Sequence, residues 1–197
     1  MANAFFSDLL ATISERGRTL LRRRIAEQSI PLGPFLEQLD AMPPHRVPGT
    51  AIFMSGTASK TPPALRHNLE HNKVLHQQVI FLTVKTEMVP YVPEEQRLEV
   101  EHFGDGMYRA KVHYGFMEDP NIPAILSAAG GHTLPRIDPK DTTYFLGRET
   151  IISTPRHGMV EWREKLFALM SRNATTATAF FGIPPDRVVE LGEQIEI

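Results

Sequence analysis

Two apolar segments flank an amphipathic one between residues 46 and 87, and this order constrains the fold more than any other feature of the sequence. Residues 50–54 are mostly apolar, residues 62–76 have the spacing of a helix with one apolar face, and residues 79–86 are apolar again. A polar loop separates the first two segments. The order predicts a strand, a crossover helix and a second strand, which form a right-handed βαβ unit in a parallel part of a sheet.

The rest of the chain continues the alternation of strands and helices. Residues 98–102 and 108–114 alternate apolar and polar side chains around a Gly-Asp-Gly turn, which predicts a β-hairpin. We also expect helices at 122–129 and 160–172 and strands at 143–145, 149–153 and 188–191. The predicted fold is an α/β layered domain with a mixed β-sheet, one βαβ unit and a β-hairpin, preceded by an amphipathic N-terminal helix.

The N-terminal segment predicts that amphipathic helix. Apolar residues recur at helical spacing through residues 5–28, while arginines crowd the other face. Such a helix either covers its own domain or lies on the inner leaflet of a membrane, with its arginines near lipid phosphates. The candidate membrane-surface residues are Arg16, Arg18, Arg22, Arg23 and Arg24. Repeated prolines between residues 29 and 48, around a short apolar helix at 35–39, predict a stiff connector. We therefore divide the chain into residues 1–45, the basic helix and connector, and residues 46–197, the α/β domain.

The composition excludes several classes of protein. The 197 residues are 42% hydrophobic and 22% charged with a net charge of -2, which is typical of a globular domain and not of a protein that binds nucleic acid through its charge. The absence of cysteine excludes disulfide frameworks, thiolate metal sites and cysteine nucleophiles. No apolar run approaches the roughly 20 residues that cross a bilayer, so we expect the chain as given to be soluble.

The polar loop after the first predicted strand is the strongest candidate for a ligand site. It leads into the start of the predicted helix, where backbone amides and the helix dipole favour an anion such as a phosphate of a small nucleotide. The candidate ligand-binding residues are Ser55, Gly56, Thr57, Ser59, Lys60 and Thr61. We also expect the Thr61 side chain to cap the helix. These residue types equally suit a tight turn, and the phosphate-loop and dinucleotide-binding patterns are absent, so both explanations stay open.

His67, Glu70 and His71 formally match the His-x-x-Glu-His pattern of a class of zinc proteases. A catalytic zinc needs a third protein ligand and a substrate cleft, whereas this segment is predicted to be a crossover helix with one face against a sheet. We therefore predict no metal site and interpret these side chains as polar residues on a solvated helix face. The Gly-x-Ser-x-Gly pattern of hydrolases is also absent. We predict no catalytic residue, no cofactor and no enzymatic activity.

Several separated segments resemble, in the same order, the cytosolic C-terminal domain of the Kup potassium-uptake transporters. They are RVPGTAIFMSG at 46–56, PPALRHNLEHNKVLHQQVIFLTVKTEMVPYV at 62–92, VHYGFMEDPNIP at 112–123, TTYFLGRETI at 142–151 and FFGIPPDRVVELGEQIEI at 180–197. A weaker match at 14–39 resembles the basic stretch that follows the last membrane helix in that family. The resemblance therefore extends over most of the chain.

The resemblance implies potassium uptake coupled to protons, with the ions crossing through a membrane bundle that precedes the matching segment in the family. It implies no ion-binding residue at these positions. The chain would then be a cytosolic domain, on the cytoplasmic side of the cell membrane, that regulates or assembles the transporter without conducting ions. Its expected partners are the transporter's membrane domain, the inner leaflet through the basic helix, a second copy of the chain and a small nucleotide. The alternative is a free-standing nucleotide-binding regulatory α/β domain.

Overall fold

A computed structural model describes residue 19 and residues 30–152 and 177–196 of the chain. The chain divides into two compact units, one of residues 30–147 and 176–191, the other of residues 1–29, 148–175 and 192–197. Most of the second unit lies outside the described residues, so the core described below is that of the first unit. The predicted helix at 160–172 also lies outside the described residues, as does the predicted helix at 5–28 apart from Thr19.

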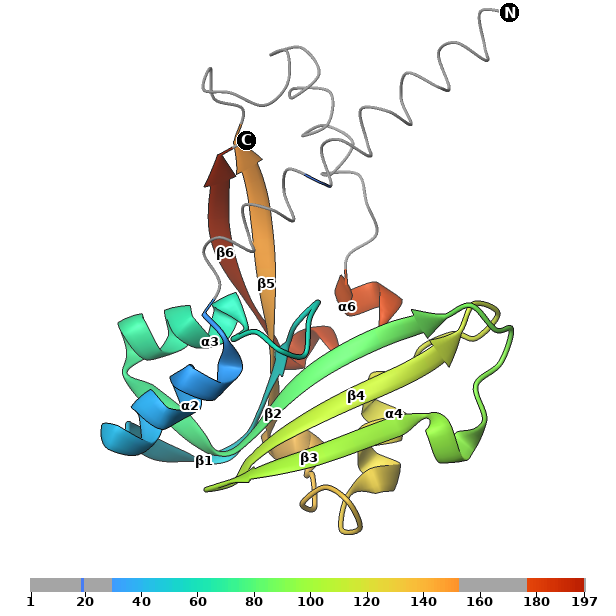
Figure 1. The fold of residues 1–197 in the computed structure, drawn as a ribbon, viewed down its shortest axis with the longest axis horizontal. Helices are drawn as coiled ribbons and strands as arrows, with labels where there is room; N and C mark the ends of the chain where they lie inside the picture. Colours follow the sequence, from blue (N-terminus) through green and yellow to red (C-terminus); the bar gives the residue numbers. More distant parts are fainter. Residues whose placement is uncertain (1–18, 20–29, 153–176, 197) are drawn as a thin grey trace, which may run out of the picture. The chain divides into compact units, whose positions relative to one another are not determined.

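The strands form one mixed sheet. Their bounds are β1 His45–Met54, β2 Val74–Glu87, β3 Leu98–Gly104, β4 Met107–Gly115, β5 Thr142–Ile152 and β6 Val188–Glu196. The six strands have the spatial order β3-β4-β2-β1-β5-β6 (Figure 1). Strand β1 is parallel to β2 and β5, β2 is parallel to β4, and β3 is antiparallel to β4. The predicted α/β fold with a mixed sheet is confirmed.

Helices cover both faces of this sheet. Their bounds are α2 Leu32–Ala41, α3 Pro63–His67, α4 Ile122–Ala129 and α6 Ala177–Phe180, with a π-helical turn at Asn68–Asn72 and 3-10 turns at Glu94–Gln96, Pro139–Asp141 and Pro185–Arg187. Helices α2 and α3 lie on one side of the sheet and α4 lies on the other (Figure 1). The sheet is therefore the middle of three layers, as expected for an α/β domain.

Alternating side chains along the strands build one core on each face. In β1, Ala51 and Phe53 belong to the core beneath α2 and α3, and Ile52 belongs to the core beneath α4. The first core consists of Leu32, Phe35, Leu39, Ala51, Phe53, Ala64, Leu65, Leu75, Val79, Phe81, Met107 and Phe145. The second core consists of Ile52, Ile80, Leu82, Ala110, Val112, Tyr114, Ile122, Leu126, Leu134, Ile137, Tyr144, Leu146 and Ile183. Both faces of the central strands are buried at this level, which explains the unbroken apolar runs at residues 51–54 of β1 and 79–82 of β2.

The hairpin of β3 and β4 and the helix α4 are confirmed. The hairpin turns at Asp105 and Gly106, whose φ angles are 45° and 71°. Positive φ at both central residues is typical of the type I′ turn, whose twist suits a two-residue hairpin loop. Helix α4 has the predicted bounds because the Asn121 side chain caps it, accepting a hydrogen bond of 3.1 Å from the Ala124 amide.

The crossover between β1 and β2 is shorter than predicted. The helix is predicted to continue to residue 76, but α3 ends at His67. A π-helical turn follows, and the helical backbone stops at Lys73, which has a φ of 58°. Strand β2 then begins at Val74 instead of residue 79. Pairing with β1 starts at the same point and buries Leu75 completely in the first core, so tertiary packing overrides the local helical spacing.

The predicted cap of this helix is also wrong. Pro62 is the N-terminal flanking residue and no side chain caps the helix. The Thr61 hydroxyl is buried and makes no hydrogen bond with any described residue, although the Thr61 amide donates to the carbonyl of Ile30 over 2.9 Å. The residue that we expected to cap α3 instead joins the loop to the segment before α2.

From residue 30 onward, the proline-rich segment is packed against the domain. Helix α2 is longer than the predicted 35–39, and Leu32, Phe35 and Leu39 are buried in the first core. Pro48 lies within β1, where the pairing with β2 changes register between Val47 and Thr50. A proline cannot donate a ladder hydrogen bond, which accounts for an irregularity at this position. The division of the chain at residue 45 stays a prediction.

Two strands that the sequence predicts separately form one continuous strand in the structure. The segments predicted at 143–145 and 149–153 form the single strand β5. Gly147, which lies between the two predicted segments, is exposed, and a Cβ there would meet no atom within 4 Å, so the strand passes through it. The last strand, β6, likewise extends beyond the predicted 188–191.

Candidate functional sites

The first half of the loop at residues 55–61 is held by hydrogen bonds of Ser55. The Ser55 hydroxyl donates to the Thr57 carbonyl over 2.8 Å and accepts from the Thr57 amide over 3.3 Å. The Ser55 amide donates to the carbonyl of Leu82 in β2. These bonds are those of a Ser/Thr turn at the end of β1, so the explanation as a tight turn accounts for them.

The second half of this loop pairs with the segment that starts α2. The Leu32 amide donates to the Ser59 carbonyl over 3.0 Å, and Lys60 forms an antiparallel bridge with Pro31. The helix that follows starts with Pro62 and Pro63, which have no amide hydrogen to offer an anion. The described bonds therefore serve the fold, and ligand binding by Ser55, Gly56, Thr57, Ser59, Lys60 and Thr61 stays a prediction.

The structure brings His67, Glu70 and His71 together. One ligand atom from each of the three side chains lies within 4.8 Å of the other two. The two imidazole rings are nearly parallel, with an interplanar angle of 6° and centroids 6.0 Å apart. Glu70 and His71 are exposed and His67 is half-buried. The structure thus places the Glu70 carboxylate beside the two imidazoles, and the absence of a metal site stays a prediction.

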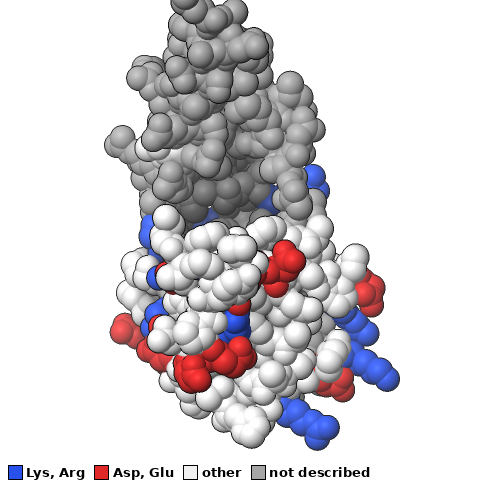
Figure 2. Space-filling view, turned by 90° about the vertical axis from the view of Figure 1, so that its right-hand side faces the viewer, with Lys and Arg blue, Asp and Glu red and all other residues white. Residues whose placement is uncertain are grey.

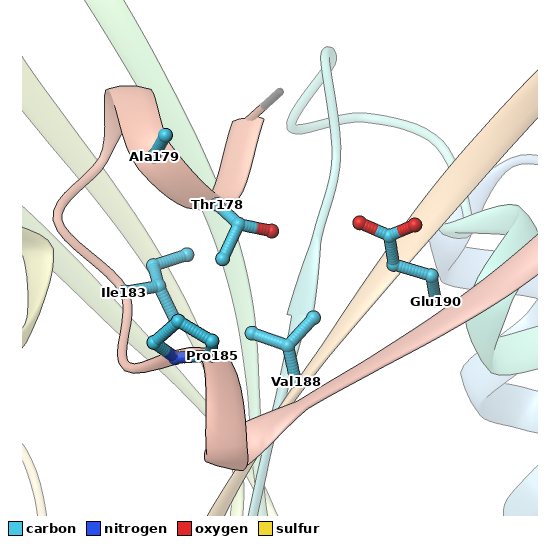
Figure 3. Close-up of a pocket in the computed structure, with 6 residues that line it drawn as sticks. All are labelled: Thr178, Ala179, Ile183, Pro185, Val188 and Glu190. Carbon is cyan, nitrogen blue, oxygen red and sulfur yellow. The ribbon is translucent and has the colours of Figure 1, made fainter. Parts of the chain in front are cut away.

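A pocket of about 470 Å³ lies between α6 and the start of β6 (Figure 3). Ile183, Pro185 and Val188 give it an apolar floor, and the Thr178 hydroxyl and the Glu190 carboxylate extend over it from opposite sides (Figure 3). None of these residues stands out in the sequence, because they come from a four-residue helix, the loop and 3-10 turn after it, and a strand.

A group of exposed apolar side chains extends from the ends of β2 and β4. We call this group the apolar tip; it consists of Met88, Val89, Tyr91, Phe116 and Met117. The exposed fraction reaches 95% for Met88. Figure 2, which views the end of the sheet where β2 and β4 terminate in Figure 1, shows an area without charged side chains, with acidic and basic residues at its margin. Large apolar patches of this kind are typical of interaction surfaces.

The backbone of the apolar tip is held in place. The Phe116 amide donates to the Val89 carbonyl over 2.9 Å, and the Met117 amide donates to the Pro90 carbonyl over 3.2 Å. Gly115 permits this approach, because a Cβ at that residue would lie 2.1 Å from the Pro90 carbonyl oxygen. The tip is therefore a fixed part of the domain.

An ion pair between Arg97 and Glu118 supports the tip from beneath. The guanidinium donates to the Glu118 carboxylate over 2.6 Å, and both side chains are only 14% exposed. The same carboxylate accepts hydrogen bonds from the amides of Gly115 and Val92, over 2.6 Å and 3.1 Å. The Arg97 hydrogen bond, together with these amides, lowers the pKa of Glu118 to about 2.

Comparison with known proteins identifies the family to which the chain belongs. Residues 48–197 match the family model of the K+ potassium transporter C-terminal domain. The chain belongs to this family. The residues matched include every described strand except the first residues of β1, and they include the apolar tip, the Arg97–Glu118 pair and the three-residue cluster at His67.

Relatives of this K+ transporter C-terminal domain are longer proteins. It is 56% identical over 183 residues to a probable potassium transport system protein, Kup 1, of Geobacter sulfurreducens, covering 92% of this chain and 29% of the relative. It is 53% identical over 188 residues to the probable Kup protein of Myxococcus xanthus, covering 95% of this chain and 29% of the relative. The probable Kup 2 protein of Chromobacterium violaceum is 46% identical over the whole chain, which covers 31% of that relative.

No solved structure matches this K+ transporter C-terminal domain. Within the part of the chain that the structure describes, none of the helices has the length and apolar character that crossing a membrane requires. Arg16, Arg18, Arg22, Arg23 and Arg24, the predicted membrane-surface residues, lie outside the described residues, and their role stays a prediction.

Glu118→Gln should alter the pH dependence of this domain's stability. The folded-state pKa of about 2 lies below the ordinary value of 4.5, so the carboxylate stabilises the fold above about pH 4.5 and that contribution is lost as the pH falls towards 2. Urea unfolding of both proteins at several pH values should show a large stability difference near neutrality that shrinks steadily below about pH 4.5. A difference that is constant across this range would contradict the role that we give to the Arg97–Glu118 pair.

Proposed function

We propose that this chain is the cytosolic C-terminal domain of a potassium uptake transporter that couples K+ to H+ and that it assembles or regulates the transporter without conducting ions. The observation that carries the proposal is the match of residues 48–197 to the K+ transporter C-terminal domain, together with relatives named as Kup proteins of which the chain spans only 29–31%. The coupling to protons and the cytosolic side follow from the resemblance to Kup proteins.

The apolar tip supports the assembly role. Its side chains are large and exposed while the backbone beneath them is fixed by hydrogen bonds and by the Arg97–Glu118 pair. Exposing such residues to water costs free energy that a partner surface recovers. The larger part of the related proteins lies outside this chain, so we propose that the tip docks on that remaining part of the transporter.

A domain-exchange experiment tests the proposed function. The segment of the Geobacter sulfurreducens relative that matches this chain is replaced by the chain, and the chimera is expressed in bacteria that lack their own potassium uptake systems. We expect the chimera to restore growth at low external K+. Neither the chain alone nor the relative truncated before the exchanged segment should restore it. Growth with the chain alone, or a truncated relative as active as the chimera, would contradict the proposal.

The tip is tested in the same chimera. Tyr91→Ser combined with Phe116→Ser should reduce K+ uptake by roughly fivefold or more, because truncating two apolar anchors of an interface typically costs about 1 kcal/mol or more. Met42→Ser, at an exposed residue outside the tip, is the matched control and should leave uptake unchanged. Both variants of the isolated chain should keep their unfolding midpoint, since the substituted side chains are exposed. Normal uptake by the double variant would exclude the tip as the docking surface.

A further inference from the structure

We propose that His67, Glu70 and His71 form a site for one divalent transition-metal ion such as Zn²⁺, which fastens the crossover between α3 and β2. This inference is independent of the transport proposal. Its carrying observation is geometric, because one ligand atom from each of the three side chains lies within 4.8 Å of the other two.

The spacing of these atoms is close to what zinc requires. Zinc binds imidazole nitrogen and carboxylate oxygen at about 2.0–2.2 Å in tetrahedral geometry, which places any two ligand atoms about 3.3 Å apart. Pairs now within 4.8 Å need to approach by at most about 1.5 Å. Rotation of the exposed side chains of Glu70 and His71 about their own bonds can supply that movement, with half-buried His67 at the base of the site.

The backbone that carries the ligands is fixed on both sides. His67 is the last residue of α3, and Glu70 and His71 lie in the π-helical turn. Within this turn, Asn68 is buried, accepts a hydrogen bond from the Asn72 amide group over 2.9 Å and donates one to the Val74 carbonyl over 2.9 Å. The site is therefore built on ordered backbone, and π-helical turns often occur at functional sites.

The donor set selects the class of ion. Two imidazoles and one carboxylate suit Zn²⁺, Ni²⁺ and Cu²⁺, whereas Mg²⁺ and Ca²⁺ prefer ligands that are all oxygen. Three protein ligands leave a fourth position for water. Because the unfolded chain lacks this preformed arrangement, bound metal should stabilise the folded turn.

Zinc titration of the purified chain tests the site. Calorimetry should detect one Zn²⁺ per chain, and thermal unfolding should shift to higher temperature when Zn²⁺ is added, while Mg²⁺ at the same concentration should give neither effect. We expect at least about tenfold weaker Zn²⁺ binding for His71→Ala and for His67→Ala, and a smaller loss for Glu70→Gln. Since His71 and Glu70 are exposed, these two variants should fold normally even if His67→Ala does not.

The matched control is His132→Ala, which removes an exposed histidine from a loop after α4. It should bind Zn²⁺ as tightly as the unmodified chain. The proposal is overturned if no stoichiometric Zn²⁺ binds, or if His71→Ala and Glu70→Gln bind it as the unmodified chain does.

Discussion

Phe53→Ala should destabilise the domain by about 3–5 kcal/mol, as expected when a phenylalanine is deleted from a well-packed core. Phe53 is fully buried near the carboxyl end of β1 and stacks on Phe145 of β5, with ring centroids 4.6 Å apart. Its removal leaves a cavity in the core that joins the sheet to α2 and α3. Urea unfolding followed by circular dichroism measures the loss, and the midpoint should fall with little change in the denaturant slope.

Two further variants make this expectation specific. Phe53→Leu keeps most of the volume and should cost less than about 1.5 kcal/mol, which provides a measurement if the alanine variant does not fold. Met88→Ala removes a large apolar side chain that is 95% exposed and should change stability by no more than about 0.5 kcal/mol. A Phe53→Ala variant as stable as Met88→Ala would contradict the described core.

Gly106→Ala should cost about 2–4 kcal/mol, combining the strain of a left-handed residue with a backbone collision. Gly106 has a φ of 71°, and a Cβ there would lie 2.2 Å from the carbonyl oxygen of Gln77. Its own carbonyl accepts a hydrogen bond of 2.9 Å from the Val79 amide, so the hairpin turn cannot move away from β2 without losing that bond. The same urea unfolding measures the effect.

Gly104→Ala separates the two causes. Gly104 is the last residue of β3, directly before the turn, and has a φ of 95°, but a Cβ there would meet no atom within 4 Å. This variant should show only the cost of the backbone conformation, about 1–2 kcal/mol. Equal losses for the two glycines would mean that the contact between the turn and Gln77 does not constrain the hairpin.

The sequence predicts best those elements that depend on local chemistry. The hairpin at Asp105 and Gly106 and the helix α4 are both found where expected, and the Asn121 side chain that caps α4 directly precedes the helix in the sequence. The start of β2 differs from the prediction because Leu75 fits the apolar face of a helix as well as a strand, and only its pairing with β1 decides between them. The position of β5 beside β1 is likewise set by contacts distant in sequence.

The candidate sites likewise combine features that the local sequence predicts with features that depend on the three-dimensional fold. The His67-x-x-Glu70-His71 spacing is visible in the sequence. The convergence of the three side chains, however, depends on a π-helical turn that the sequence pattern does not predict. The apolar tip looks like core in the sequence, because Val89 and Phe116 continue from strands that are buried. Whether an apolar side chain near a strand end is buried or exposed can be decided only from the position of that end in the structure.

Potassium accumulation by vesicles reconstituted with purified protein tests the central claim most directly. We expect vesicles that contain the chimera to accumulate K+ under an imposed proton gradient and vesicles that contain only this chain to accumulate none. Accumulation of K+ by the chain alone would contradict the account.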